Sequence, residues 1–251
     1  METYKITTLK MGTLVAEKSS LTMGKDFGVS IDIPMWSIAL EGAGHKILVD
    51  TGIRSLEWVK KYLGDQYDVL QEEDETIEGA LAVIGWKPED VDIVINTHLH
   101  YDHAGCNYLF RNARFYVQRS EWEYAFNCVE NQKCFYFEEL YGWEAVRYPQ
   151  WKFVDGECEI LPGLKLVPLG GHTVGSQGIL VNTEEGALFL AGDATNLAEN
   201  LWDNNLPNIV VDVDSGYHAL EVIRTRADYF IPFHDSLIQK YQHDHFLPVR
   251  R

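Results

Sequence analysis

Short apolar stretches that end on a histidine or an aspartate recur along this chain. Four of them precede a possible metal ligand: 91–96 before His98, 164–169 before His172, 187–191 before Asp193 and 229–233 before His234. Apolar runs of this length are typical of buried β-strands. Because a strand leaves the residues that follow it at the rim of a sheet, we expect the four ligands to converge there.

Other parts of the pattern predict further strands, a turn and helices. Strands are expected at residues 4–9, 36–40, 46–49, 115–117 and 178–181, and a hairpin turn at the Glu-Glu-Gly of residues 184–186. Helices are expected at residues 55–63, 74–84, 120–126 and 214–226. Asp74 is expected to cap the second helix, and Asp214 or Ser215 the fourth. Ser120 and Glu123 are expected to form a capping box in the third helix.

The strands are clustered, and the helices are dispersed among them. This order favours an α+β fold in which two sheets pack face to face and helices cover the outside. No linker or low-complexity stretch interrupts the 251 residues, so one domain over residues 1–251 is expected. Residues 127–151 are rich in aromatic side chains but weakly periodic, which fits either a loop folded over the site or a peripheral insertion.

The charge balance restricts the possible partners. The formal net charge is −17, with 21 Lys and Arg against 38 Asp and Glu, so no nucleic-acid partner is expected. The N-terminus carries no apolar signal segment and no stretch is long enough to span a membrane, so we expect a cytoplasmic protein without a membrane partner. The four cysteines lack Cys-x-x-Cys spacing, and Cys106 either lines the site or packs in the core.

The densest cluster of possible ligands lies between His98 and His103. His98 and His100 are two residues apart, so on an extended chain both side chains leave the same face and can bind one ion. Asp102 and His103 follow where the chain must turn, which lets them point to a neighbouring position. This local spacing alone predicts a metal site.

The complete set of expected ligands contains five imidazoles and two carboxylates, which suits zinc or a similar first-row ion. Asp193 has two carboxylate oxygens and is expected to bridge two ions. The expected ligands are His98, His100, His172 and Asp193 for the first ion, and Asp102, His103, His234 and Asp193 for the second. We therefore expect two divalent metal ions per chain, Zn²⁺ in the first place, with Mn²⁺, Fe²⁺ or Co²⁺ as alternatives.

Residues 97–105 resemble the His-x-His-x-Asp-His signature of the metallo-β-lactamase superfamily, and the three later ligands follow in that family's order. The resemblance covers roughly residues 4–235. It implies an αββα sandwich with the metal site at one edge of the two packed sheets. It also implies that Asp50 orients a ligand histidine, because metal-bound imidazoles usually donate their second N–H to a carboxylate or carbonyl.

Within the superfamily, the chain is most similar to the N-acyl-homoserine lactonases and related enzymes such as the 4-pyridoxolactonases. Residues 34–37, 47–52 and 117–121 carry this narrower resemblance. The lactonases usually have a tyrosine three residues after the bridging aspartate, whereas this chain has Asn196. Many relatives also have Gly-His shortly after the third metal histidine, where this chain has Gly-Ser at residues 175–176. These two departures concern the substrate rather than the metals.

The resemblance and the ligand set together predict a dinuclear hydrolase that opens a small lactone or ester, as in quorum quenching. Two metal ions can lower the pKa of a shared water to about 7, so that a bridging hydroxide attacks the carbonyl carbon. Asp102 is expected to pass a proton to the leaving group, and Asn196 is expected to donate to the oxyanion. Met35, Trp36 and aromatic residues between Phe126 and Trp143 either form an apolar wall beside the metals or pack in the core.

Two other functions fit the same residues. Thioester hydrolysis of the glyoxalase II type uses the same metals, but it normally needs basic residues for glutathione, and the chain has no convincing basic cluster. A metal-binding module without catalysis is the other alternative. The expected partner is a small-molecule lactone or ester, and the chain is expected to be a monomer or a homodimer.

Overall fold

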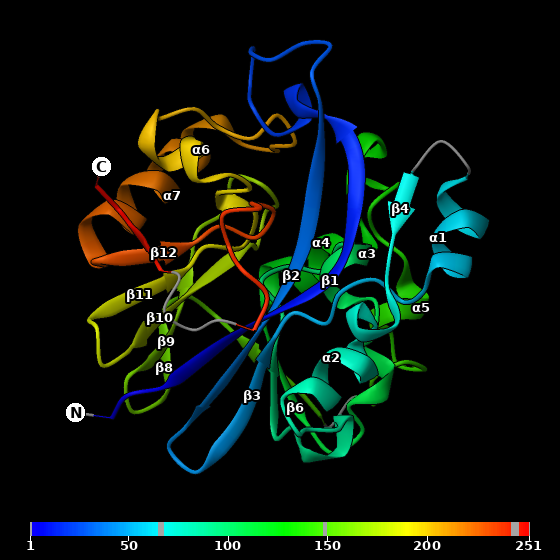
Figure 1. Cartoon of the computed structure of the whole chain (residues 1–251), viewed down its shortest axis with the longest axis vertical. Helices are drawn as coiled ribbons and strands as arrows, with labels where there is room; N and C mark the ends of the chain where they lie inside the picture. Colours follow the sequence, from blue (N-terminus) through cyan, green and yellow to red (C-terminus); the bar gives the residue numbers. More distant parts are fainter. Residues whose placement is uncertain (1, 65–67, 148–149, 242–245, 251) are drawn as a thin grey trace.

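Two mixed β-sheets pack face to face, and helices cover their outer surfaces (Figure 1). The structure is a computed structural model and describes residues 2–64, 68–147, 150–241 and 246–250. The α+β sandwich expected from the sequence is confirmed. Within the described ranges, no helix has the length and apolar character needed to cross a membrane.

The first sheet has seven strands in the order β4-β1-β2-β3-β5-β6-β7. Their bounds are Lys5–Glu17 (β1), Ser30–Gly42 (β2), His45–Val49 (β3), Asp68–Leu70 (β4), Ile93–Ile95 (β5), Arg114–Gln118 (β6) and Trp151–Val154 (β7). The second sheet has six strands in the order β13-β12-β11-β10-β9-β8. Their bounds are Cys158–Leu161 (β8), Leu164–Pro168 (β9), Gln177–Asn182 (β10), Ala187–Leu190 (β11), Tyr229–Ile231 (β12) and Leu247–Pro248 (β13).

Neighbouring residues of one strand face different cores. Ile47 and Val49 of β3 lie in the core between the two sheets, whereas Leu48 faces the helices outside the first sheet. In the second sheet, Phe189 of β11 faces outward in the same way. This follows from the two-residue period of a strand, and it explains why strands buried on both faces are continuously apolar.

In the part of the chain that the structure describes, seven α-helices lie outside the sheets or at their ends. Their bounds are Leu56–Leu63 (α1), Ile77–Val83 (α2), Tyr101–Ala104 (α3), Arg119–Phe126 (α4), Glu138–Tyr141 (α5), Ala198–Trp202 (α6) and Val213–Arg226 (α7). Short 3-10 turns cover Lys18–Ser20 (η1), Glu73–Glu75 (η2), Pro88–Asp90 (η3), Asn107–Leu109 (η4), Glu130–Gln132 (η5) and Gly192–Ala194 (η7). Helices α1, α2, α4 and α5 pack on the first sheet, and α6 and α7 pack on the second (Figure 1).

The caps predicted for α2 and α7 are wrong by two to three residues. Asp74 lies in η2, and Thr76 caps α2 instead. Asp212 caps α7, and its carboxylate accepts from the backbone N–H of Ser215 at 2.9 Å. Asp214 is therefore the second residue of the helix. A cap needs extended backbone, and the tertiary fold placed that extended residue slightly earlier or later than the composition indicated.

The capping box predicted for Ser120 and Glu123 is also wrong. Helix α4 follows β6 directly, with Gln118 as the preceding extended residue and no side-chain cap. Ser120 therefore lies inside the first turn, where it cannot cap. The helix over this region is nevertheless present, as predicted.

The predicted strands at residues 4–9 and 36–40 belong to β1 and β2, which are thirteen residues each. The rest of β1 contains polar residues such as Lys10 and Thr13, so the apolar pattern does not predict it as a strand. A register shift between these two residues, with Gly12 at φ 123°, marks a β-bulge. The hairpin turn predicted at residues 184–186 is confirmed, because Thr183 donates its N–H to the Gly186 carbonyl at 2.9 Å between β10 and β11.

Candidate metal centre

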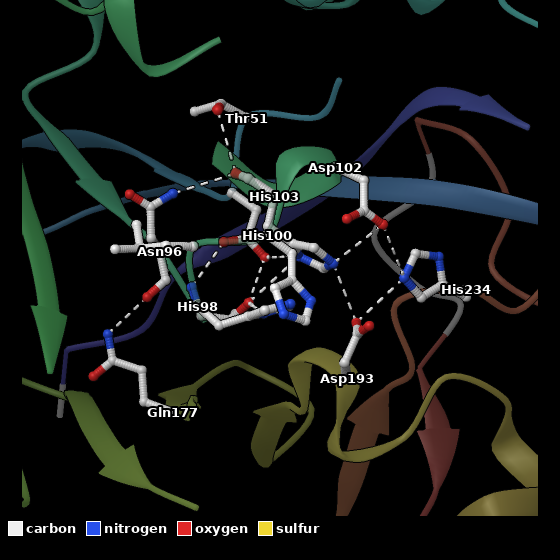
Figure 2. Close-up of polar contacts among 12 residues, drawn as sticks. Thr51, Asn96, His98, His100, Asp102, His103, Gln177, Asp193 and His234 are labelled. Atoms are coloured by element: carbon white, nitrogen blue, oxygen red, sulfur yellow. Dashed lines mark hydrogen bonds and ion pairs between the residues drawn. The ribbon is translucent and has the colours of Figure 1, made fainter. Parts of the chain in front are cut away.

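The candidate ligands lie after the carboxyl ends of strands from both sheets. Strand β5 leads to residues 98–103, and β9, β11 and β12 lead to His172, Asp193 and His234. Strands β9, β11 and β12 run in one direction, because β10 is antiparallel to β9 and β11, and β11 is parallel to β12. Their ends therefore meet at one edge of the second sheet, beside the loop that follows β5 (Figure 2).

One group of three histidines forms what we call the first half-site: His98, His100 and His172. Their ligand nitrogens lie within 4.8 Å of one another, and all three side chains are buried. His100 Nδ1 lies 3.2 Å from His172 Nε2, although the two residues are 72 positions apart. The structure thus brings together the three histidines that the sequence assigned to the first ion.

A second group, which we call the second half-site, contains Asp102, His103 and His234. Asp102 Oδ2 lies 3.6 Å from His103 Nε2 and 3.7 Å from His234 Nε2. Asp102 and His103 lie in the single turn of α3, and the His103 ring lies 4.0 Å from the His98 ring, centroid to centroid. Their grouping with His234 nevertheless places Asp102 and His103 around a position different from that of His98 and His100.

Asp193 lies between the two half-sites (Figure 2). Its Oδ1 is 3.3 Å from His103 Nε2 and 3.2 Å from His234 Nε2. Its Oδ2 is 3.5 Å from His172 Nε2 in the first half-site. One carboxylate therefore faces both groups, which is the geometry that a bridging ligand needs.

Four of the five histidines have one ring nitrogen anchored by the protein. The Nδ1 contacts are His98 to Thr97 Oγ1 at 3.0 Å, His103 to Asp50 Oδ2 at 2.7 Å, His172 to the Ile209 carbonyl at 2.7 Å and His234 to the Pro34 carbonyl at 3.0 Å. Such contacts orient the ring and leave Nε2 available for a metal.

Several buried atoms of the centre have no hydrogen-bond partner among the described residues. They are the Nε2 atoms of His98, His100 and His103 and the Oδ1 atom of Asp193. Leaving a buried polar atom unsatisfied costs about 1–3 kcal/mol, so such a cluster favours a bound cation. Imidazole nitrogens and carboxylate oxygens at these separations suit divalent first-row cations, which would satisfy His98 Nε2, His103 Nε2 and Asp193 Oδ1. His100 instead presents its Nδ1 to His172 Nε2 in the first half-site.

The charges of the two half-sites differ. Burial, together with the neighbouring imidazoles, holds the pKa of His98 and of His100 well below its usual range. Burial also lowers the pKa of His103, but Asp193, Asp102 and Asp50 outweigh it and raise that pKa well above the usual range. The first half-site therefore favours neutral imidazoles, whereas the carboxylates around His103 favour its charged form in the second half-site.

Asp50 makes the contact expected of it. This fully buried carboxylate accepts from His103 Nδ1 through Oδ2, and from the Thr97 N–H through Oδ1, both at 2.7 Å. Its Oδ2 also accepts from the Thr97 hydroxyl at 2.7 Å. The backbone of Asp50 is left-handed (φ 58°), which turns the chain at the end of β3 toward the centre.

A family model for the metallo-beta-lactamase superfamily matches residues 33–239. The chain belongs to the metallo-β-lactamase superfamily. Divalent metal binding is the property of this superfamily that the converging ligands and unsatisfied atoms support.

Several superfamily members are similar over most of the chain. An N-acyl homoserine lactonase of Bacillus sp is 32% identical over 215 residues, which are 82% of each chain. A Bacillus cereus protein of the same name is 32% identical over 213 residues, 81% of this chain and 80% of its own. A solved N-acyl homoserine lactone hydrolase, with N-hexanoyl-L-homoserine bound at its catalytic metal center, is 27% identical with a TM-score of 0.81; the match covers 94% of this chain and 95% of that one.

Asn196, the residue expected to donate to an oxyanion, lies beside the second half-site. It is 3% exposed, and its backbone carbonyl accepts from the N–H of His234 at 2.9 Å. The strand that delivers His234 is therefore tied to the segment that carries Asp193 and Asn196. The role of the Asn196 amide stays a prediction.

Of the two alternatives for Met35 and Trp36, the structure shows core packing. Both side chains are core residues, 3% and 5% exposed, because β2 is covered on both faces. Two aromatic residues of the segment between Phe126 and Trp143 do lie beside the candidate ligands. The rings of Phe135 and Tyr136 lie 4.9 Å and 4.7 Å from the His100 ring, centroid to centroid.

The described part of the segment 127–151 lies beside the site, as expected for a loop folded over it rather than for a peripheral insertion. It contains the short η5 and α5 turns, and Phe135 accepts from the N–H of Tyr101 through its carbonyl at 3.0 Å. Residues 148–149 lie outside the described residues. Cys106 packs in the core and donates to the Ile53 carbonyl at 3.1 Å, so packing is its role rather than lining the site.

Sequence reasoning missed the most extensively bonded carboxylate near the centre, Glu121. It occurs in a stretch that carried only the narrower family resemblance, and its neighbours suggested a helix cap. The structure buries it completely. A glutamate in the first turn of a helix is ordinary, so no local signal distinguished it.

Proposed function

We propose that this protein is a dinuclear metal-dependent hydrolase that opens small lactones, with N-acyl-homoserine-lactone-like substrates in the first place. The observation that carries the proposal is the convergence of seven side chains around buried, unsatisfied nitrogen and oxygen atoms. The similar lactonases support the substrate class, because they share both the fold and most of the chain length.

The chain's own residues have distinct tasks in this proposal. His98, His100 and His172 hold one divalent ion, Asp102, His103 and His234 hold the other, and Asp193 reaches both. We propose Zn²⁺ for both positions, because the donor set is mostly imidazole. Such ions, when bound, supply Lewis acidity toward a carbonyl oxygen and hydroxide near neutral pH.

Proton transfer and charge stabilisation fall to side chains beside the metals. Asp102 is more exposed than the other ligands, with 17% of its side chain accessible, so its carboxylate can carry a proton to the leaving alcohol. The Asn196 amide can donate to the developing oxyanion. Phe135 and Tyr136 cover His100 and limit the access of water to it.

A substrate screen on purified protein, combined with metal analysis, tests this proposal. The panel contains acyl-homoserine lactones, aromatic lactones, simple esters and thioesters. We expect two ions per chain and the fastest turnover on a lactone. Faster thioester cleavage would point to a glyoxalase-II-like activity, and two ions without turnover of any compound would indicate a metal-binding module.

A further inference from the structure

Glu121 is a buried charge that the proposed mechanism does not use. It is 0% exposed and lies in the first turn of α4. Its Oε1 accepts from the Leu99 N–H at 3.0 Å and from the Tyr136 hydroxyl at 2.8 Å. Its Oε2 accepts from the Thr173 hydroxyl at 2.6 Å and from the Gly175 N–H at 3.2 Å. A buried carboxylate is costly, and this one is offset by four donors.

The four donors all flank the first half-site. Leu99 lies between His98 and His100, and Thr173 directly follows His172. The ring of Tyr136 packs on the ring of His100. Glu121 thus joins the two loops that carry the three histidines and the aromatic residue that covers one of them. Within the described ranges, no hydrogen bond joins Glu121 to the second half-site.

The loop after His172 is also pressed against the start of α4. A Cβ atom added to Gly175 would lie 2.1 Å from the Glu121 backbone nitrogen and 2.5 Å from its Cα. Only glycine allows this close approach of two backbones. The position of the loop relative to the carboxylate is therefore closely restrained.

We propose that Glu121 is a positioning residue that sets the spacing of the two loops of the first half-site, and with it the metal affinity of that half-site alone. The alternative is that Glu121 only stabilises the fold. Its loss would then change zinc affinity equally at both half-sites or not at all. The inference rests on the metal centre of the proposed function but not on its substrate. A failure of lactone hydrolysis would therefore leave it intact.

The test uses Glu121→Gln in two backgrounds that each keep one half-site. His234→Ala retains the three histidines of the first half-site, and His172→Ala retains the ligands of the second. Zinc affinity is measured by competition with a chromogenic chelator. We expect Glu121→Gln to weaken zinc binding roughly 10- to 100-fold in the His234→Ala background, the range typical of residues that orient metal ligands. In the His172→Ala background we expect no change.

A matched control makes the same chemical change in a buried carboxylate elsewhere. Glu75 is 6% exposed, pairs with Lys10 at 3.0 Å and accepts from the Glu72 N–H at 3.1 Å. Glu75→Gln is expected to lower the melting temperature without changing zinc affinity in either background. Equal weakening by Glu121→Gln in both backgrounds, or none in the His234→Ala background, overturns the proposal.

Two milder variants keep the proposal testable if Glu121→Gln does not fold. Tyr136→Phe and Thr173→Val each remove one donor and preserve the shape of the side chain. Each is expected to weaken zinc in the His234→Ala background by a smaller factor than Glu121→Gln. Unchanged affinity in both variants would contradict the proposal. A wild-type protein that binds zinc but opens no lactone would refute the proposed substrate and not this inference.

Discussion

The two halves of the metal centre are supported by buried carboxylates in different ways. Asp50 contacts a ligand directly, with its Oδ2 at 2.7 Å from His103 Nδ1. Glu121 contacts no candidate ligand and instead accepts from the residues beside them. Both side chains are 0% exposed, so the difference lies in what they bind and not in how deeply they are buried.

The two carboxylates can therefore support a metal site in two different ways. A carboxylate on an imidazole fixes the ring's tautomer and makes the ligand nitrogen more basic. A carboxylate on the backbone between ligands cannot tune an individual ring, but it can set the distance between the loops that carry them. The first half-site joins segments more than 70 residues apart, so its loop spacing needs such support.

The largest expected effect comes from removing the residue that both halves share. Asp193→Ala should lose bound metal and hydrolytic activity together, because each Asp193 oxygen faces a different half-site. Metal analysis after gel filtration, with a lactone assay on the same sample, checks this. Asp155→Ala serves as the control, since that carboxylate is 67% exposed and pairs with Arg119. Full metal content and activity in Asp193→Ala would refute the bridging assignment.

A variant that keeps the ligands of both half-sites should change only the rate of hydrolysis. Asn196→Ala is expected to keep two ions and to lower kcat about 100-fold, the scale for losing one oxyanion donor. Steady-state kinetics on metal-saturated protein measures the effect. Loss of metal in this variant would mean that Asn196 supports the second half-site through His234, whose N–H its carbonyl accepts. An unchanged kcat would exclude the proposed donor role.

Asp50→Asn should give the opposite selectivity to Glu121→Gln. Zinc affinity is expected to fall roughly 10- to 100-fold in the His172→Ala background, which keeps the second half-site. A smaller loss is expected in the His234→Ala background, because Asp50 reaches His98 only through the Thr97 hydroxyl. Equal losses in both backgrounds would show that the two carboxylates do not divide the centre between them.

The smallest expected effect comes from Gly175→Ala. The added methyl group would overlap the start of α4, and overpacking of this kind typically costs about 1–3 kcal/mol of stability. We expect a lower denaturant midpoint together with weaker zinc binding in the first half-site only. Chemical denaturation of the metal-free protein and zinc titration measure the two effects separately. Weaker zinc binding in the second half-site instead would contradict the proposal that Glu121 and its neighbouring loop support the first half-site alone.

Much of the fold and of the ligand set could be predicted from local features. The run at residues 98–103 places three imidazoles and a carboxylate within six positions, and strand ends precede the remaining ligands. The helix caps were predicted incorrectly and the apolar wall stayed open, because both depend on which face of an element the rest of the chain covers. Met35 and Trp36 have the composition of a binding wall but lie in a strand covered on both sides.

The sequence by itself determined which residues can bind a metal and which strands deliver them, because donor chemistry and the period of a strand are local properties. The tertiary structure alone decided how closely the ligands of each half-site approach one another and that Glu121 supports the first half-site. Glu121 accepts from residues 15, 22, 52 and 54 positions away. Contacts at such separations depend on how the two sheets and the covering segment pack, and no local pattern in the chain encodes them.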